Sequence, residues 1–293
     1  MAPTGRRWLV ILNPASGTGR KAGLDSAIQN GFLRFGISAQ IRFTGGPGEA
    51  TELAAEHSGN FEVIVAAGGD GTVRETAIGL FGSTCSLGIL PLGSGNGLAR
   101  HLRLSTHLPT AIEQLAHASA HPSDAYQING RPGVNVGGIG FDGEIARLFS
   151  GQKKRGLNGY LNLIFSIFSK YPEFQAEFSE GGVIENVPAF FVAAANGSQF
   201  GNNAIIARDA LITDGLLNIR TIRKPSWKQM PGLCLSLYRR RPHDLVSTRL
   251  ATELILKTST PQPIHADGDF IEVTDQIRIK VIPSAFRILI PNS

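Results

Sequence analysis

Segments typical of strands and of helices alternate through the first part of the chain, and this alternation limits the fold more than any other feature of the sequence. The expected strands are residues 8–12, 39–44, 61–67 and 87–91. The expected helices are residues 21–35, 49–57, 73–80 and 96–102. Strand and helix in alternation favour a parallel sheet that is covered on both faces, and such sheets bind ligands in the loops that follow the strands.

The pattern changes near residue 125 to short apolar runs separated by Gly, Asn and Pro turns. The expected strands are residues 127–135, 174–178, 189–195, 216–222, 276–282 and 285–290. These runs favour an antiparallel sandwich or barrel, interrupted by residues 157–170, whose apolar spacing is close to helical. We therefore expect an α/β domain at 1–124, completed by 283–293, and a β-rich domain at 125–282.

Composition limits the partners and the compartment. The net charge of +5 suits nucleic acid, an anionic membrane or a phosphorylated substrate. The basic clusters at 153–155 and 239–241 are short and lack interleaved aromatic residues, so we expect no nucleic-acid partner; they form either a solvated face or a membrane contact. Cys85 and Cys234 lie far apart, which favours a reducing cytoplasm. No apolar run reaches the roughly 18 residues of a membrane span, so membrane contact would be peripheral.

Three of the expected strands end in a glycine-rich polar turn, at residues 13–17, 68–72 and 93–97. Glycine lets backbone N–H groups approach phosphates, Ser and Thr add hydroxyl donors, and the following helix contributes positive partial charge. Together the turns predict a phosphate cradle. Asp70 would repel a triphosphate unless a metal or a donor mediates, so it implies Mg²⁺ or a ribose contact. Residues 17–21 lack the P-loop spacing.

These residues resemble the diacylglycerol kinase catalytic family, which includes sphingosine and ceramide kinases and bacterial lipid kinases. The similarity covers nearly the whole chain, in segments 13–17, 68–75 (GGDGTVRE), 88–100 (GILPLGSGNGLAR), 137–143 (GGIGFDG), 209–217 (DALITDGLL) and 267–269 (DGD). It implies a Rossmann-like domain of the NAD-kinase and phosphofructokinase type, followed by an antiparallel β-sandwich. It also implies ATP as donor, Mg²⁺ as cofactor and a lipid hydroxyl as acceptor.

The resemblance assigns ATP contacts to residues of the glycine turns and to one neighbouring position, and it gives Glu75 the role of bracing the helix after the second turn. The implied ATP-binding residues are Asn13, Pro14, Ser16, Gly17, Thr44, Gly69, Asp70, Gly71, Thr72, Gly93, Ser94 and Asn96.

Two acidic turns in the second half carry the remaining implied roles. The resemblance places a structural Mg²⁺ at the carboxylate of Asp214 and the main-chain carbonyls of Leu211 and Leu216, although Asp214-Gly215 also suits an ordinary hairpin turn. Asp267 and Asp269 match the family's DGE signature, whose acidic residues accept the proton. Because Asp stands at 269 where the signature has Glu, either acid could accept the proton, and we favour Asp267. Asp70 would complete the catalytic group.

Other interpretations remain at this point. Gly138, Gly140 and Gly143 fit a dinucleotide fingerprint by count, but the acidic residue expected about 20 positions later is missing. We expect close backbone packing there, with Asp142 facing the cleft. The protein could instead be a GGDG kinase of a soluble substrate such as NAD, or a non-catalytic nucleotide- or lipid-binding regulator. The sequence leaves open a homodimer, and it leaves open which lipid is phosphorylated. We expect a cytoplasmic, peripherally membrane-associated enzyme.

Overall fold

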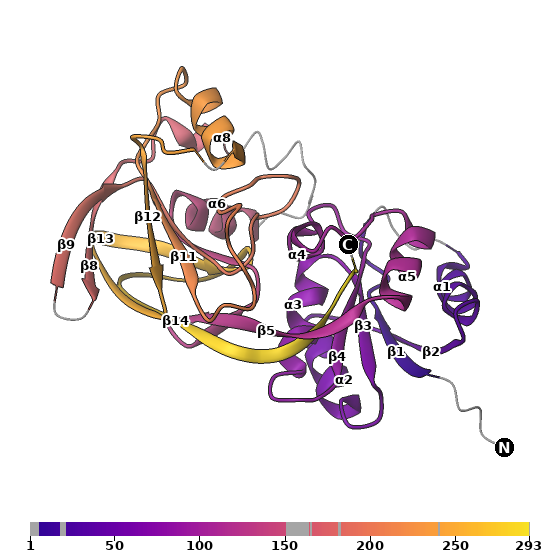
Figure 1. The fold of residues 1–293 in the computed structure, drawn as a ribbon. Coiled ribbons are helices and arrows are strands. Elements are labelled where there is room, and N and C mark those ends of the chain that lie inside the picture. The colour runs from indigo at the N-terminus through magenta and orange to yellow at the C-terminus, as the bar shows by residue number, and fades with distance from the viewer. Residues whose placement is uncertain are drawn as a thin grey trace. The chain divides into compact units, whose positions relative to one another are not determined.

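Figure 1 shows a computed structural model of the chain, which describes residues 6–17, 22–150, 164, 166–180, 183–239 and 241–292. The chain forms two compact units. The first comprises Met1–Asp124, Gly201–Asn203 and Ser284–Ser293, and the second comprises Ala125–Phe200 and Ala204–Pro283. The basic cluster at 153–155, Arg240 and most of the helix expected at 157–170 lie outside the described residues.

The first unit is built on a parallel sheet, as expected. Its strands are β1 (Arg6–Leu12), β2 (Ile37–Phe43), β3 (Val63–Gly68), β4 (Ser86–Pro91) and the end of β14 (Asp269–Ile290), in the order β14-β4-β3-β1-β2. Every residue of β3 and β4 is buried. Apolar runs without polar alternation are what a parallel sheet buried on both faces requires.

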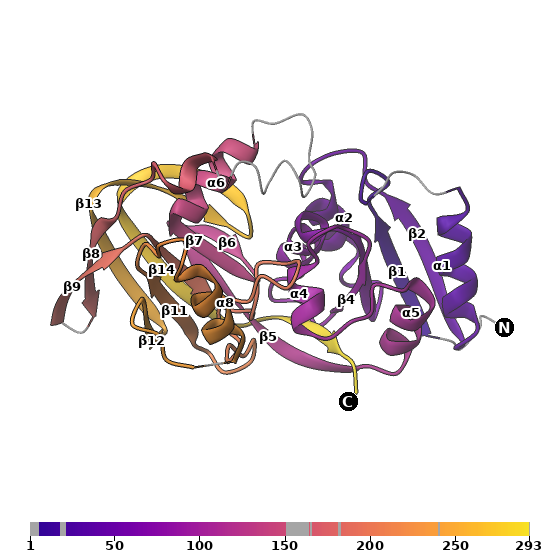
Figure 2. The same ribbon diagram turned by 90° about the horizontal axis from the view of Figure 1, so that it is seen from above.

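Helices cover both faces of this sheet. They are α1 (Leu24–Leu33), α2 (Glu49–His57), α3 (Asp70–Gly79), α4 (Gly97–His101) and α5 (Leu108–Ala116). α1 contacts α5, and α2 contacts α3; the two pairs lie on opposite faces (Figure 2). α5 was not expected from the sequence. It begins with Pro109 in its first turn, where proline needs no hydrogen-bond partner, and buries Ile112 and Leu115.

The second unit is an antiparallel β-sandwich, also as expected. Its strands are the end of β5 (Ser119–Ile128), β6 (Arg131–Gly133), β7 (Val136–Gly140), β8 (Phe174–Glu180), β9 (Val183–Ala189), β10 (Phe191–Ala195), β11 (Leu217–Ile222), β12 (Val246–Ala251), β13 (Glu253–Ala266) and the first part of β14. The main order is β12-β11-β10-β7-β13-β14, and β8 pairs with β13 and β9. Alternate residues of these strands form the core, which includes Phe178, Leu256 and Ile279.

Several details of this unit differ from the sequence-based expectation. The strand expected at 127–135 is interrupted at Asn129 and Gly130, which have φ of 47° and 78°, so β5 and β6 form a hairpin there. The strands expected at 276–282 and 285–290 are parts of the single long strand β14. Two helices were missed, α6 (Phe141–Ser150) and α8 (Met230–Arg239).

Parts of the chain that are distant in sequence complete the first unit. β14 pairs with β4 through Arg287 and Ile288, and the backbone N–H of Ser284 donates to Asp124 Oδ1 at 2.7 Å. Among the described residues, no helix combines the length and the apolar character that crossing a bilayer would take.

Candidate functional site

The first two glycine turns meet at the carboxyl ends of β1 and β3, which are neighbours in the sheet. Asn13 Nδ2 donates to Thr72 Oγ1 at 3.1 Å, and the backbone N–H of Gly69 donates to Ser16 Oγ at 3.3 Å. Asn13 Oδ1 also accepts from the backbone N–H of Ala15, which shapes its own turn. The predicted residues of these turns therefore lie together.

Asp70 joins the second turn to the third. As the first residue of α3, it accepts hydrogen bonds from the backbone N–H of Asn96 at Oδ2 (2.8 Å) and of Gly97 at Oδ1 (2.6 Å). The structure shows this carboxylate anchoring the backbone of the neighbouring turn, and its contact with Mg²⁺ or ribose stays a prediction. A Cβ on Gly95 would lie 2.5 Å from Asp70 Oδ2, so glycine is needed for this approach.

The third turn is closed by its own asparagine and supported by a distant segment. Asn96 has φ of 55°; its Oδ1 accepts from the N–H of Gly93 at 3.1 Å and its Nδ2 donates to the carbonyl of Gly93 at 2.7 Å. The carbonyl of Gly95 accepts from Arg100 Nε and from the N–H of Asn202, both at 3.1 Å. Sequence analysis gave Arg100 no role although it lies in the quoted segment 88–100, and it missed Asn202 because no local pattern links that residue to Gly95.

A cavity of about 340 Å³ opens beside the first turn. Its lining includes the predicted residues Asn13, Pro14 and Ser16, and it also includes Phe43 and Leu92, which were not predicted. A lining that combines polar and apolar side chains is typical of small-molecule sites. The exposed Phe43 ring at the end of β2 is a signal that a search for surface aromatic residues could have found.

The remaining predicted nucleotide residues differ in exposure. Thr44 is buried, and its N–H donates to the carbonyl of Leu12, so it supports the first turn. Gly71 and Ser94 are exposed, whereas Glu75 is partly buried in α3 and its carbonyl accepts from Thr51 Oγ1. A Cβ on Gly17 would lie 2.5 Å from the carbonyl oxygen of Leu92, and one on Gly93 would lie 2.5 Å from the Cα of Gly69.

In the second unit, the two acids of the DGD turn have different environments. Asp267 has φ of 50° and lies between β13 and β14. Its Oδ1 accepts from the Tyr126 hydroxyl (2.8 Å) and from the N–H groups of Asn135 and Val136, and its Oδ2 accepts from the N–H of Val134 (2.7 Å). Asp269 is exposed at the first position of β14. Asp267 therefore braces the turn that presents Asp269.

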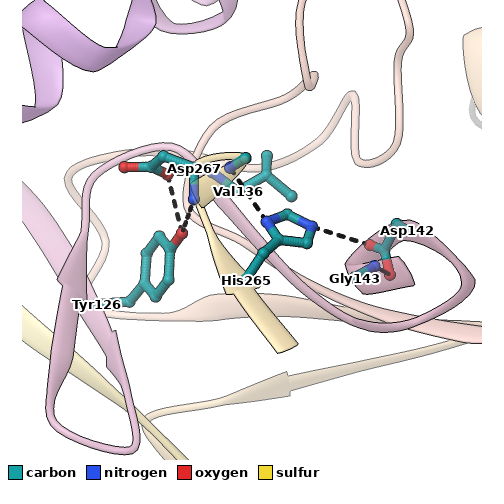
Figure 3. A network of polar contacts seen from close by, with 7 residues as sticks. Tyr126, Val136, Asp142, Gly143, His265 and Asp267 are labelled. Atoms are coloured by element: carbon teal, nitrogen blue, oxygen red, sulfur yellow. Dashed lines mark hydrogen bonds and ion pairs between the residues drawn. The ribbon is translucent and has the colours of Figure 1, made fainter. Parts of the chain in front are cut away.

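A buried histidine holds the other side of this turn (Figure 3). The N–H of Gly268 donates to His265 Nδ1 at 3.1 Å, so Nδ1 is an acceptor and Nε2 carries the proton. His265 Nε2 lies 3.3 Å from Asp142 Oδ2, and Asp142 Oδ1 accepts from the N–H of Gly143 at 2.9 Å. His265 is only 2% exposed. This chain of contacts links α6 to the DGD turn and was missed by sequence analysis.

The glycines at 138, 140 and 143 serve close packing, as expected. A Cβ on Gly138 would lie 1.8 Å from Asp142 Oδ2, and one on Gly143 would lie 2.0 Å from the carbonyl oxygen of Pro263. Asp142 contacts His265 at this point.

Burial, and then the negative charges of Asp142 and Glu144, raise the pKa of Tyr171, so its phenol stays protonated at neutral pH.

The predicted metal turn is an exposed loop. Asp214 Oδ1 accepts from the N–H of Leu216 at 3.0 Å, and Leu211 is exposed. The described part of the chain holds no cluster of three or more His, Cys, Asp or Glu side chains arranged for a metal ion. One carboxylate with main-chain carbonyls and water are nonetheless ligands of the kind that Mg²⁺ accepts, so the donor chemistry of Asp214, Leu211 and Leu216 fits a divalent cation.

Comparison with known proteins agrees with the two-unit architecture. The model of the diacylglycerol kinase catalytic domain matches residues 7–128, and that of the YegS C-terminal NAD kinase beta sandwich-like domain matches residues 138–290. A protein of Alcanivorax borkumensis named "Probable lipid kinase YegS-like" is 28% identical over 268 residues, which cover 87% of each chain. A protein of the same name from Pseudomonas putida is 27% identical, covering 86% of this chain and 85% of its own.

A crystal structure described as a diacylglycerol kinase from Bacillus anthracis has the same fold, with a TM-score of 0.75 and 20% identity over 99% of this chain and 98% of its own. The fold and the two matched domains place this protein in a class of kinases that consist of an α/β unit and a β-sandwich. This chain belongs to the family with the YegS C-terminal NAD kinase beta sandwich-like domain, and it carries a diacylglycerol kinase catalytic domain before it. Kinases of this kind use ATP and a divalent metal.

Proposed function

We propose that this protein transfers the γ-phosphoryl group of ATP to the hydroxyl group of a lipid such as a diacylglycerol, a sphingoid base or a related molecule. The observation that carries the proposal is the DGD turn, where Asp267 is held by hydrogen bonds while Asp269 is exposed. An exposed carboxylate on a braced turn suits the acceptor of a hydroxyl proton, because a substrate hydroxyl can approach it from solvent. The geometry therefore favours Asp269 over Asp267 as the proton acceptor.

The first unit would hold the nucleotide. The cavity beside Asn13 and Phe43 has room for the nucleoside, and the N–H groups at the start of α3 suit phosphate oxygens. Asp70 keeps the second and third turns in register, which fixes the positions of the donors before the nucleotide binds. Phosphoryl transfer depends mainly on such positioning and on charge neutralisation, and Mg²⁺ would supply part of the latter.

Asp214, with the carbonyls of Leu211 and Leu216, would hold a structural Mg²⁺ in the second unit. A lipid acceptor also implies that the reaction takes place at a membrane surface. We propose a cytoplasmic enzyme that attaches peripherally to the membrane. These assignments rest on the family resemblance and on the donor chemistry of the turn.

The test is ATP-dependent labelling of a total lipid extract by the full chain, with mass spectrometry of the labelled species. We expect Asp269→Asn to abolish labelling and Asp275→Asn, a change in the same strand, to leave it intact. Absence of any labelled lipid from the wild-type protein would refute the proposal. Phosphorylation of NAD instead would identify a kinase of a soluble substrate, and ATP binding without turnover would identify a regulator.

A further inference from the structure

An apolar stripe lies exposed on α8 and on the turn before it. Trp227, Leu235 and Tyr238 are 50%, 48% and 52% exposed, and Pro231 is also exposed. Within α8, Pro231, Leu235 and Tyr238 are spaced four and three residues apart, which places them along one side of the helix, and Trp227 lies in the turn that precedes it. This stripe consists of Trp227, Pro231, Leu235 and Tyr238.

The other side of α8 is already packed. Leu233 is buried, and Leu237 packs against the same core cluster, which includes Ile206 and Ala210 of the second unit. α8 is therefore apolar on two sides, and only one of these sides packs against the core of the second unit. A helix of this kind needs a second apolar environment for its exposed side, because single exposed apolar residues are common but an aligned set is not.

The stripe is held in place at both ends. Ser226 N–H and Oγ both donate to Gln229 Oε1, at 2.9 and 2.8 Å, and this cap fixes the turn that carries Trp227. The Trp227 ring packs against Phe168 with ring centroids 4.4 Å apart. At the other end, Arg208 donates to the carbonyl of Tyr238 at 2.8 Å, and its guanidinium lies 4.5 Å from the centre of the Tyr238 ring. The side chains are thus positioned before any partner binds.

The segment that carries the stripe contains basic residues and no acidic ones. Residues 215–243 contain no Asp or Glu, and they contain these basic residues: Arg220, Arg223, Lys224, Lys228, Arg239, Arg240 and Arg241. Lys228, Arg239 and Arg241 are exposed, whereas Arg220 pairs with Asp209 and Arg223 pairs with Glu173. The chain as a whole has a net charge of only +5, so its positive excess is concentrated in this segment.

We propose that this stripe docks the protein on an anionic lipid bilayer, with Trp227 and Tyr238 at the level of the headgroups. The proposal rests on the proposed function, in which the acceptor is a lipid. Trp and Tyr favour the interface because each has an apolar body and a polar tip, and surrounding Lys and Arg residues are attracted to anionic headgroups. A second copy fits less well, since a symmetric dimer would bring two basic segments together.

The test is co-sedimentation of the full chain with vesicles, without ATP and without acceptor lipid. Vesicles of equal parts phosphatidylcholine and phosphatidylglycerol should bind the protein, more weakly as salt is raised, and vesicles of phosphatidylcholine alone should bind it poorly. The variant Trp227→Ser/Leu235→Ser/Tyr238→Ser should bind about a hundredfold more weakly. Leu33→Ser, a matched control at an exposed leucine of α1, should bind like the wild type.

Tryptophan fluorescence gives an independent measurement. Trp8 is 2% exposed and Trp227 is half exposed, so a blue shift of the emission on vesicle binding should come from Trp227 and be lost in Trp227→Phe. Unchanged binding by the triple variant would overturn the proposal. Conversion of a wild-type dimer into a monomer by the triple variant would also overturn it, because the stripe would then be a dimer interface.

A kinase assay with a short-chain lipid dispersed in solution separates this inference from the proposed function. The triple variant should phosphorylate the dispersed lipid like the wild type and should lose activity on anionic vesicles. Wild-type protein that binds vesicles but labels no lipid would refute the proposed function and leave docking intact. Wild-type protein that labels dispersed lipid but ignores anionic vesicles would overturn docking alone.

Discussion

Replacing Asp267 separates a structural role from a catalytic one at the DGD turn. Asp267→Ala removes the acceptor for the Tyr126 hydroxyl and for the N–H groups of Val134, Asn135 and Val136. These groups are partly buried, so the loss of each hydrogen bond to the carboxylate costs about 1 kcal/mol, at the low end of the usual range. Alanine at a φ of 50° adds about 1 kcal/mol.

The expected sum is a loss of about 4 to 5 kcal/mol in the free energy of unfolding of the second unit, a large part of the roughly 5–15 kcal/mol of a typical domain. Asp267→Asn retains the side-chain shape and one acceptor oxygen, so it should lose about half as much. Asp269→Ala, at an exposed position, should change the stability by less than about 0.5 kcal/mol and abolish kinase activity.

Urea unfolding should be followed by Trp227 fluorescence in a Trp8→Phe background, so that the signal reports the second unit. The reasoning is wrong if Asp267→Ala unfolds at the wild-type urea concentration. It is also wrong if Asp269→Ala retains turnover while a folded Asp267 variant has none, since Asp267 would then be the proton acceptor.

Three further predictions concern the first unit and the two cysteines. Asp70→Ala should weaken ATP binding, measured by calorimetry, about ten- to a hundredfold, because the third turn loses two hydrogen bonds to a charged acceptor. Burial, and then Arg103, lower the pKa of His101 from 6.5 to about 4. As the pH is lowered, the unfolded chain therefore binds this proton before the folded chain does, and the free energy of unfolding should fall by up to about 3 kcal/mol from pH 6.5 to pH 4. Urea titrations over this range should show a smaller fall for His101→Gln than for the wild type. Burial raises the pKa of Cys85 to about 11, so a thiol reagent at neutral pH should modify the exposed Cys234 alone in the folded protein and both cysteines in denaturant.

The glycine turns were predictable from sequence because a strand, a glycine-rich turn and a helix follow one another locally. The partners of Asp70 were not predictable, since they depend on which strands are neighbours and on the direction of one side chain. The same limit applies to the DGD turn. The sequence left the choice between Asp267 and Asp269 open, and only the positions of Tyr126 and of the backbone near Val134 distinguish them.

The missed helices have specific causes. α6 starts with Phe141 in a glycine-rich segment that predicts a turn, and Gly143 is required there by the close approach of Pro263, a residue of another strand. α8 begins with Met230, Pro231 and Gly232, and proline and glycine normally argue against a helix, although proline is accepted in the first turn. In both cases, tertiary contacts outweigh local preference.

Strand β14 makes the order of synthesis matter for this protein. Strands β1 to β4 of the first unit precede the β-sandwich in the chain, but their sheet receives Arg287 and Ile288 only after the β-sandwich has been translated. Until then β4 is an open edge, and open strand edges invite pairing with other chains. A nascent chain would thus carry an incomplete first unit throughout translation of the β-sandwich, with the edge of β4 open during that interval.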